Sequence, residues 1–411
     1  MKTQEKSFLN NKIMGIKTPF SKSELMPKEE TLEIRKHRSQ LFIGIPKENF
    51  KFEKRVCLTP EAVKMFVNAG HRILIESNAG MEANYTDKEY SEAGAEVTKD
   101  TKKVFECSII IKVEPPTIEE IDLMKPKTYL ISALQLKTQK KEFFEALTKK
   151  KITALSFESI QDQESTYPFL SALGEIAGIA SIHIASELMN KCNNGKGLLF
   201  GNVTGIPNTE VVILGAGTVA ENAARTALGF GANVKIFDNS IHKLKRIQDR
   251  LNQRVFTSTI QETILQKALM RCDVVIGAIR GKNRSPIVVS EIMVQRMKPK
   301  SVIVDVCIDN GGCFETSEIT THEKPTFIKH NVVHYCVPNI SSRYSKTATL
   351  AISNIISPYL LDVAENGGIE NVLLYNKNIR AGVYMYQGIL VNQSIGEWFS
   401  LDYKDINLIV F

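Results

Sequence analysis

The sequence predicts an α/β protein made of two doubly wound, Rossmann-like domains with a cleft between them. Three observations support this prediction. Short apolar runs alternate with helical patterns from residue 41 onward. One of these runs enters a glycine-rich turn at residues 215–220. The length of 411 residues also exceeds what a single hydrophobic core usually holds together.

The first part of the chain predicts an arm followed by alternating strands and helices. Residues 1–40 are polar and charged with few apolar positions, so we expect a mobile N-terminal arm. Ordered structure should begin with a strand at residues 41–46. Thr59 and Pro60 are an N-cap followed by proline at the first helical position, and they predict a helix through residues 62–68. Further strands are expected at residues 72–76, 108–113, 128–132 and 152–156, with a helix near 119–124.

The second part of the chain repeats this alternation. A long apolar helix is expected at residues 171–190, as a connector between the domains. The strand at residues 211–214 follows it, and a helical pattern returns at 347–361. Other strands are expected at residues 233–238, 273–277 and 301–306, with a further apolar stretch at 332–337. Strands that alternate with helices indicate parallel sheets.

The glycine-rich turn has the pattern Gly-x-Gly-x-x-Ala. Gly215 suits a tight turn, and Gly217 lets the backbone approach the phosphates of a dinucleotide. Ala220 is small enough for close packing of the helix on the strand. Free N–H groups at the start of that helix favour negative charge. The turn therefore predicts a pyrophosphate site.

The next predicted strand ends in Asp238, about 20 residues beyond the glycines. A carboxylate there can accept hydrogen bonds from both ribose hydroxyls and repel a 2′-phosphate, so NAD is the expected cofactor. Lys243 and Lys245 leave NADP open as an alternative. The other alternative, a glycine-rich connection with Asp238 as a cap, explains neither the spacing nor the two strands.

Composition and charge exclude several other classes of protein. The net charge of +7 is spread through interleaved Lys and Glu, without the clustered basic face of a nucleic-acid-binding protein. Seven scattered cysteines suit a reducing cytoplasm, and the histidines form no metal-ligand pattern. Without an uncharged apolar run of about 18 residues, no membrane span is expected. We therefore expect a cytoplasmic protein that binds small molecules and contains no metal.

Several motifs along the chain match a known family. They lie at residues 44–48, 55–60, 93–95, 174–178, 215–217, 305–315 and 336–339. In these motifs the sequence resembles alanine dehydrogenase and the NAD-binding part of proton-translocating transhydrogenase. The run Ile-Asp-Asn-Gly-Gly-Cys-Phe-Glu at 308–315 is the most specific and points to the dehydrogenase branch.

The resemblance implies a domain organisation. Residues 41–167 and 346–411 would form a discontinuous substrate domain, and residues 168–345 would form the NAD-binding domain. The active site would lie in the cleft between them. The resemblance also implies a homo-oligomer, often a hexamer.

It also implies roles for three residues. Arg55 matches the arginine that binds the substrate carboxylate, a task that suits a planar guanidinium. Asp309 matches the active-site aspartate, which takes part in proton transfer beside the nicotinamide. Asn339 matches a loop residue that contacts the cofactor. The alternatives are a surface arginine for Arg55 and a turn cap for Asp309.

Two positions depart from the family pattern. Where alanine dehydrogenases carry a lysine that polarises the substrate, this chain has Glu114, and where they carry a histidine acid/base, it has Gln135. Glutamine cannot exchange a proton near neutral pH. Acid/base catalysis typically contributes about 10² to 10⁴ in rate, so the usual chemistry needs Glu114, Lys112 or Asp309 to take over.

The leading hypothesis is an NAD-dependent alanine dehydrogenase-type oxidoreductase that converts L-alanine to pyruvate and ammonia. Asp309 would be catalytic, and Arg55, Glu114 and Gln135 would bind the substrate. The alternatives are a dehydrogenase for another amino acid or amine, an NAD(H)-binding regulatory protein without catalysis, and a transhydrogenase component. The residues expected at the cofactor are Gly215, Ala216, Gly217, Val219, Ala220, Asp238, Lys243, Ile279, Ile308 and Asn339.

Overall fold

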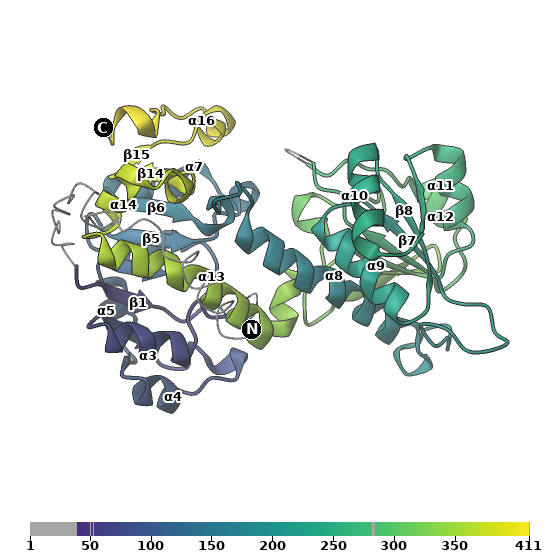
Figure 1. Cartoon of the computed structure of the whole chain (residues 1–411), viewed down its shortest axis with the longest axis horizontal. Coiled ribbons are helices and arrows are strands. Elements are labelled where there is room, and N and C mark those ends of the chain that lie inside the picture. The colour runs from purple at the N-terminus through teal and green to yellow at the C-terminus, as the bar shows by residue number, and fades with distance from the viewer. Residues whose placement is uncertain (1–38, 50, 52, 282–283, 411) are drawn as a thin grey trace, which may run out of the picture.

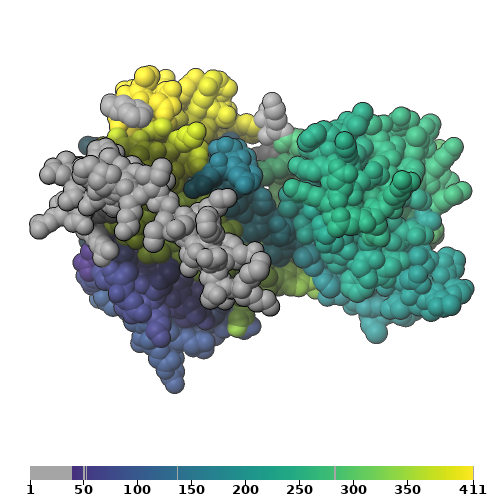
Figure 2. All heavy atoms as spheres, viewed as in Figure 1, coloured from purple at the N-terminus to yellow at the C-terminus, as the bar shows by residue number. Residues whose placement is uncertain are grey.

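The structure is a computed structural model that describes residues 39–410, apart from residues 50, 52, 282 and 283. The predicted N-terminal arm therefore lies almost entirely outside the described residues. The described chain forms two lobes, each built around one sheet (Figure 1). In Figure 2, residues from the early and late parts of the chain, in purple and yellow, form one lobe. Residues from the middle of the chain, in teal and green, form the lobe beside it.

The first sheet has eight strands among the described residues, in the order β15-β14-β6-β5-β4-β1-β2-β3. Strands β1 to β6 are parallel, whereas β14 and β15 are antiparallel to their neighbours. The strands are β1 (Phe42–Ile45), β2 (Arg72–Glu76), β3 (Glu96–Thr98), β4 (Ile109–Ile111), β5 (Tyr129–Ser132), β6 (Thr153–Ser156), β14 (Val383–Tyr386) and β15 (Ile389–Leu390). The helices between them are α3 (Pro60–Asn68), α4 (Asp87–Glu92), α5 (Thr101–Phe105), α6 (Ile118–Leu123) and α7 (Lys141–Lys149).

The second sheet has seven strands among the described residues, in the order β12-β13-β11-β10-β7-β8-β9, and only the pair β12 and β13 is antiparallel. The strands are β7 (Glu210–Leu214), β8 (Asn233–Phe237), β9 (Phe256–Ser258), β10 (Val274–Gly277), β11 (Val302–Asp305), β12 (Thr326–Lys329) and β13 (Val332–Tyr335). The helices are α9 (Thr218–Gly229), α10 (Ile241–Leu251), α11 (Glu262–Leu269) and α12 (Glu291–Gln295).

Both sheets are covered on their two faces, as parallel sheets require. In β4, Ile109 and Ile111 belong to one apolar cluster, and Ile110 belongs to another on the opposite face. In β7, Ile213 and Leu214 likewise lie in separate clusters. The predicted α/β fold with two Rossmann-like sheets is confirmed. The three-residue edge strands β3 and β9 were not predicted, because they are short and largely polar.

Two long helices link the lobes, α8 (Pro168–Met189) and α13 (Ser345–Glu365) (Figure 1). Gly178 of α8 packs so closely on α9 that a β-carbon would overlap the carbonyl oxygen of Val219. After α13, the chain continues through α14 (Ile369–Tyr375) and α15 (Lys377–Arg380) into β14, which pairs with β6, and it ends near α16 (Gln393–Phe399).

The two linking helices are also apolar. By length and composition alone, Pro168–Met189 and Ile340–Glu365 could each cross a membrane. Of their most apolar windows, 44% and 50% respectively are buried inside the molecule. Their apolar side chains are thus partly used in contacts within the protein.

Candidate active site

Gly215 and Gly217 lie in the turn between β7 and α9 and have different structural roles. Gly215 has a φ of +110°, and a β-carbon there would overlap the carbonyl oxygen of Ala278. Around Gly217 a β-carbon would meet no atom within 4 Å. Ala220 is fully buried in the first turn of α9. The turn therefore leaves space for a ligand at the N-terminus of α9, as a pyrophosphate requires.

Asp238 follows β8 and contacts this turn. Its carboxylate accepts hydrogen bonds from the Ala216 N–H at 2.8 Å and the Ser240 N–H at 2.7 Å. The residue is half-buried, so part of it remains open to a ligand. Asp238 thus stabilises the turn, as the capping interpretation expects, and the predicted contact with a ribose stays a prediction. Arg246, which sequence analysis missed, donates to the Ala216 carbonyl oxygen at 3.4 Å, and its Nε is buried without a partner.

Most other predicted cofactor residues lie near the carboxyl ends of adjacent parallel strands. Val219 is half-buried in α9, and Ile279 is half-buried just after β10. Ile308 is buried after β11, whereas Lys243 is exposed on α10. Because the carboxyl ends of β7, β8, β10 and β11 share one sheet edge, these residues surround the same region.

The loop after β11 is organised by Asp305. Its carboxylate accepts hydrogen bonds from the backbone N–H groups of Cys307 and Cys313 and from the Ser317 hydroxyl. The thiols of Cys307 and Cys313 lie close enough to the carboxylate to resemble a metal-ligand group. Since the carboxylate oxygens already have several donors, we interpret this group as the anchor of the loop. The loop in turn positions Asp309.

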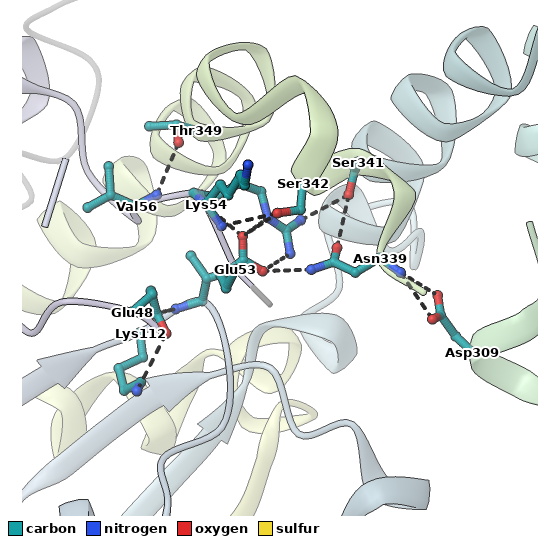
Figure 3. A network of polar contacts seen from close by, with 12 residues as sticks. Glu48, Glu53, Lys54, Val56, Lys112, Asp309, Asn339, Ser341, Ser342 and Thr349 are labelled. Atoms are coloured by element: carbon teal, nitrogen blue, oxygen red, sulfur yellow. Dashed lines mark hydrogen bonds and ion pairs between the residues drawn. The ribbon is translucent and has the colours of Figure 1, made fainter. Parts of the chain in front are cut away.

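A continuous chain of hydrogen bonds joins Asp309 to the first lobe (Figure 3). The Asn339 N–H donates to Asp309 Oδ1 at 3.1 Å, and Asn339 Nδ2 donates to Glu53 Oε2 at 2.7 Å. Arg55 binds Glu53 through Nε at 2.7 Å and Nη2 at 2.6 Å, and its Nη1 donates to Ser341 Oγ at 3.0 Å. The structure therefore brings together Arg55, Asn339 and Asp309, three of the residues predicted from the sequence.

Glu53 is the centre of this chain. It is fully buried and accepts from five donors, three of them on Arg55 and the others on Asn339 and Ser342. Burial by itself would raise the pKa of Glu53, but the charge and hydrogen bonds of Arg55 outweigh burial and lower it. Arg55 has five N–H donors, and its side chain uses three of them. Two N–H groups, one on each terminal nitrogen, take part in none of these three hydrogen bonds, and the side chain is 5% exposed.

Asp309 is exposed to solvent as a residue, although many protein atoms surround its carboxyl. Burial of the carboxyl among neighbouring protein atoms raises its pKa to about 6. The Asn339 N–H and the charge of Arg55 oppose this shift, while Glu158 adds to it. An aspartate that titrates near neutral pH can both accept and donate a proton.

Polar residues also follow the carboxyl ends of four adjacent strands in the first sheet. Glu158, Gln135, Glu114 and Glu48 follow β6, β5, β4 and β1, which are neighbours in that order. Gln135 has a φ of +44°, and its N–H donates to Glu158 Oε2 at 3.3 Å. Glu114 and Gln135 therefore lie at the same sheet edge.

Lys112 directly follows β4, and two carboxylates of the first lobe surround its ammonium. Its ammonium lies 2.9 and 3.0 Å from the two oxygens of Glu120 and 3.4 Å from Glu48 Oε2, and the residue is buried. Glu48 also accepts from the Val113 N–H at 2.6 Å. Burial raises the pKa of Glu48 to about 7 despite the charge of Lys112. Lys112 thus has its own carboxylate partners inside the protein.

Glu114 is half-buried close to Arg55 and Glu53. Burial, followed by the charge of Glu53, raises its pKa to about 7. The charges of Arg55 and Lys112 and a hydrogen bond with Gln135 oppose the shift. The predicted substrate residues Glu114 and Gln135 are therefore in contact with each other.

Sequence analysis missed Glu53, Ser341, Glu48 and Glu158. A signal for Glu53 was present, because side chains two residues apart in an extended segment lie on the same face, and Glu53 precedes Arg55 by two positions. The others contact residues far away in the sequence. Glu48 closes the motif at residues 44–48, but nothing local gave Ser341 or Glu158 a role.

The fold and the glycine-rich turn define a dinucleotide-binding protein of the Rossmann type. The family model "Alanine dehydrogenase/PNT, N-terminal domain" matches residues 44–177, and "Alanine dehydrogenase/PNT, C-terminal domain" matches residues 181–393. Alanine dehydrogenase 2 of Staphylococcus aureus (strain USA300) is 37% identical over 366 residues, which cover 89% of this chain and 98% of the relative.

Solved structures agree. An L-alanine dehydrogenase superimposes with a TM-score of 0.82 at 33% identity, covering 88% of this chain and 99% of the other. A transhydrogenase from Sinorhizobium meliloti, at 22% identity and a TM-score of 0.73, covers 86% of this chain and 99% of its own, and it shares the fold. The chain belongs to the alanine dehydrogenase/PNT family. NAD is the cofactor of this family, and the open space at Gly217 and the position of Asp238 fit it.

Proposed function

We propose that the protein is an NAD-dependent alanine dehydrogenase that converts L-alanine to pyruvate and ammonia. The observation that carries the proposal is the hydrogen-bond chain from Asp309 through Asn339 and Glu53 to Arg55. This series of hydrogen bonds connects the carboxyl ends of the strands in the second sheet with the buried guanidinium of Arg55 in the first lobe. It supports a site that holds a cofactor and a carboxylate substrate next to each other.

The binding roles follow from the donors that remain free. The turn at Gly215 and Gly217 would hold the pyrophosphate, and Asp238 the ribose. The two N–H groups of Arg55 without an internal partner would bind the substrate carboxylate. When bound, NAD supplies the hydride acceptor.

Asp309 would accept or donate a proton at the cofactor side of the site. Burial raises the pKa of its carboxyl to about 6, so both protonation states are accessible near neutral pH. The Asn339 N–H fixes its orientation. Exposure of Asp309 allows it to contact a bound substrate.

The test is NADH formation by the full-length protein with L-alanine, together with NADH consumption with pyruvate and ammonium. We expect turnover in both directions. The double variant Glu114→Lys, Gln135→His restores the side chains of the related dehydrogenases and serves as a comparison. Turnover by this variant and not by the natural protein would reject the proposal and show that the pocket serves another ligand.

A dehydrogenase for a different amino acid or amine is the second candidate, and Glu114 favours it. An ionised Glu114 would attract a cationic group that alanine lacks on its side chain. Turnover of another L-amino acid with a higher kcat/KM than L-alanine would support this candidate. NAD(H) binding without turnover of any amino acid would instead support a regulatory protein.

The proposal includes the domain division and assembly implied by the resemblance. Residues 41–167 with 346–411 would form the substrate domain, and 168–345 the NAD-binding domain. We also propose a cytoplasmic homo-oligomer. Light scattering of the purified protein measures its molar mass in solution, and a monomer at micromolar concentration would contradict this part.

A further inference from the structure

We infer that Glu114 is the residue of the first lobe that exchanges a proton with the substrate, and that Gln135 positions it. This inference rests on the proposed function, because it assumes an amino-acid substrate bound at Arg55. The proton in question is one on the substrate's nitrogen. Asp309 lies at the carboxyl ends of the strands in the other sheet and is proposed to act on the cofactor side.

Three ionisable groups of the first lobe are less suited to this role than Glu114. Arg55 itself stays charged at any physiological pH. Glu53 is fully buried and already accepts from five donors, so no lone pair remains for a substrate. Lys112 is buried, with its ammonium bound to Glu120 and Glu48.

Two further groups need consideration. Glu48 is 5% exposed and is held by Lys112 and the Val113 N–H. His322 lies within electrostatic range of Arg55. Its Nε2 has no hydrogen-bond partner, but this atom is buried, so a substrate cannot reach it. Glu114, by contrast, is only half-buried.

The position of Glu114 suits a substrate held by Arg55. Glu114 follows β4 and Gln135 follows the adjacent strand β5, so both lie at one sheet edge. The Gln135 backbone N–H is held by Glu158, and its side chain bonds Glu114. An α-amino acid bound by its carboxylate at Arg55 presents its ammonium a few ångströms away, within reach of a neighbouring carboxylate.

The charges in this region favour such a pairing. Glu48, Glu53, Glu114 and Glu120 could carry four negative charges, against the two positive charges of Arg55 and Lys112. A substrate carboxylate adds another negative charge. A substrate ammonium next to Glu114 offsets it, and the raised pKa of Glu114 makes the proton transfer between them easier.

The step is a simple proton transfer. One N–H bond of the substrate ammonium breaks, and an O–H bond forms on Glu114. The nitrogen keeps the electron pair, which it needs to form a C=N bond when the α-hydrogen leaves. Nothing is oxidised or reduced in this step, and Glu114 afterwards releases the proton to water.

The experiment uses the full-length protein. L-Amino acids are first tested for NADH formation, and kcat/KM of the best substrate is then measured across pH for the natural protein and Glu114→Gln. We expect the natural kcat/KM to rise with pH through about 7, since Glu114 must be ionised to accept a proton. Glu114→Gln should lower kcat/KM by about 10² to 10⁴ and lose this pH dependence. NADH affinity, followed by fluorescence, should not change.

Three further variants separate catalysis from structure. Glu119→Gln changes an exposed carboxylate at the start of α6 and should keep the natural rate. Glu114→Ala should recover activity when formate is added, since a small acid can occupy the space of the lost carboxyl. His322→Asn should keep the pH dependence.

The outcomes are distinguishable. If the natural protein converts an amino acid and Glu114→Gln has the same kcat/KM, the inference is wrong and the proposed function stands. A slow Glu114→Gln that keeps the natural pH dependence, or loss of that dependence in His322→Asn, also overturns it. If the natural protein converts no amino acid, the proposed function fails and the inference fails with it.

Discussion

The carboxyl edges of the two sheets differ in how they are built. At the edge of the second sheet, backbone geometry dominates: Gly215 requires its left-handed conformation, Gly217 leaves open space, and Asp238 receives backbone N–H groups. At the edge of the first sheet, buried charges such as Glu53 and Arg55 dominate. A dinucleotide can be bound by a local turn, whereas substrate chemistry depends on side chains gathered from several strands.

The largest effect is expected from breaking the buried pair in the first lobe. Arg55→Ala leaves Glu53 charged and fully buried, which should lower the free energy of unfolding by about 3–5 kcal/mol. Urea unfolding at neutral pH measures the loss. The double variant Arg55→Ala, Glu53→Gln should recover part of it, because no unpaired charge remains. Equal loss in the single and double variants would mean that packing, not charge, is responsible.

The next effect is a pH dependence caused by Glu48. Its pKa is raised by burial from 4.5 to about 7, so the folded state binds a proton that the unfolded state releases between these values. Stability should therefore fall as pH rises from about 4.5 to 7, by about 3 kcal/mol from this group. Thermal unfolding of Glu48→Gln across this range should show a flatter profile than the natural protein. An identical profile would contradict the assignment.

Two glycine variants test the nucleotide side. Gly215→Ala combines a left-handed conformation with overlap at the Ala278 carbonyl, so we expect a loss of stability of about 2 kcal/mol. Gly217→Ala has open space and should keep its stability but bind NADH more weakly, because the methyl group occupies the ligand's place. Thermal unfolding and NADH fluorescence titration separate the two results. Unchanged NADH affinity in Gly217→Ala would place the cofactor elsewhere.

The smallest effect concerns the choice of cofactor. Asp238→Ser removes the carboxylate that we propose accepts a charge-assisted hydrogen bond from the ribose. Such a bond is worth about 1.5 kcal/mol, so NADH affinity should fall about tenfold. NADPH affinity should fall less than NADH affinity: both nucleotides lose the support of Asp238 for the turn, but the carboxylate that repels a 2′-phosphate is also gone. Fluorescence titration with both nucleotides measures the ratio. A natural protein that prefers NADPH would contradict the role assigned to Asp238.

Strands with continuous apolar runs, such as 72–76 and 273–277, were predicted because a sheet covered on both faces needs apolar residues throughout. Strands β12 and β15 are partly exposed and lie at or near sheet edges, where this signal weakens. The contact between Arg55 and Glu53 was only partly visible in their spacing. Their contacts with Asn339 and Ser341 join residues more than 280 positions apart, and no local pattern encodes them.

The sequence by itself determined the alternating fold, the glycine turn with Asp238, and the family motifs around Arg55 and Asp309. These features depend on periodicity and on backbone requirements that act over a few residues. Only the tertiary structure decided which charges meet: Lys112 turns to Glu120 and Glu48, Glu53 receives five donors, and Glu114 remains partly open. The physical reason is that a buried ionisable group takes its pKa from neighbours brought together by folding.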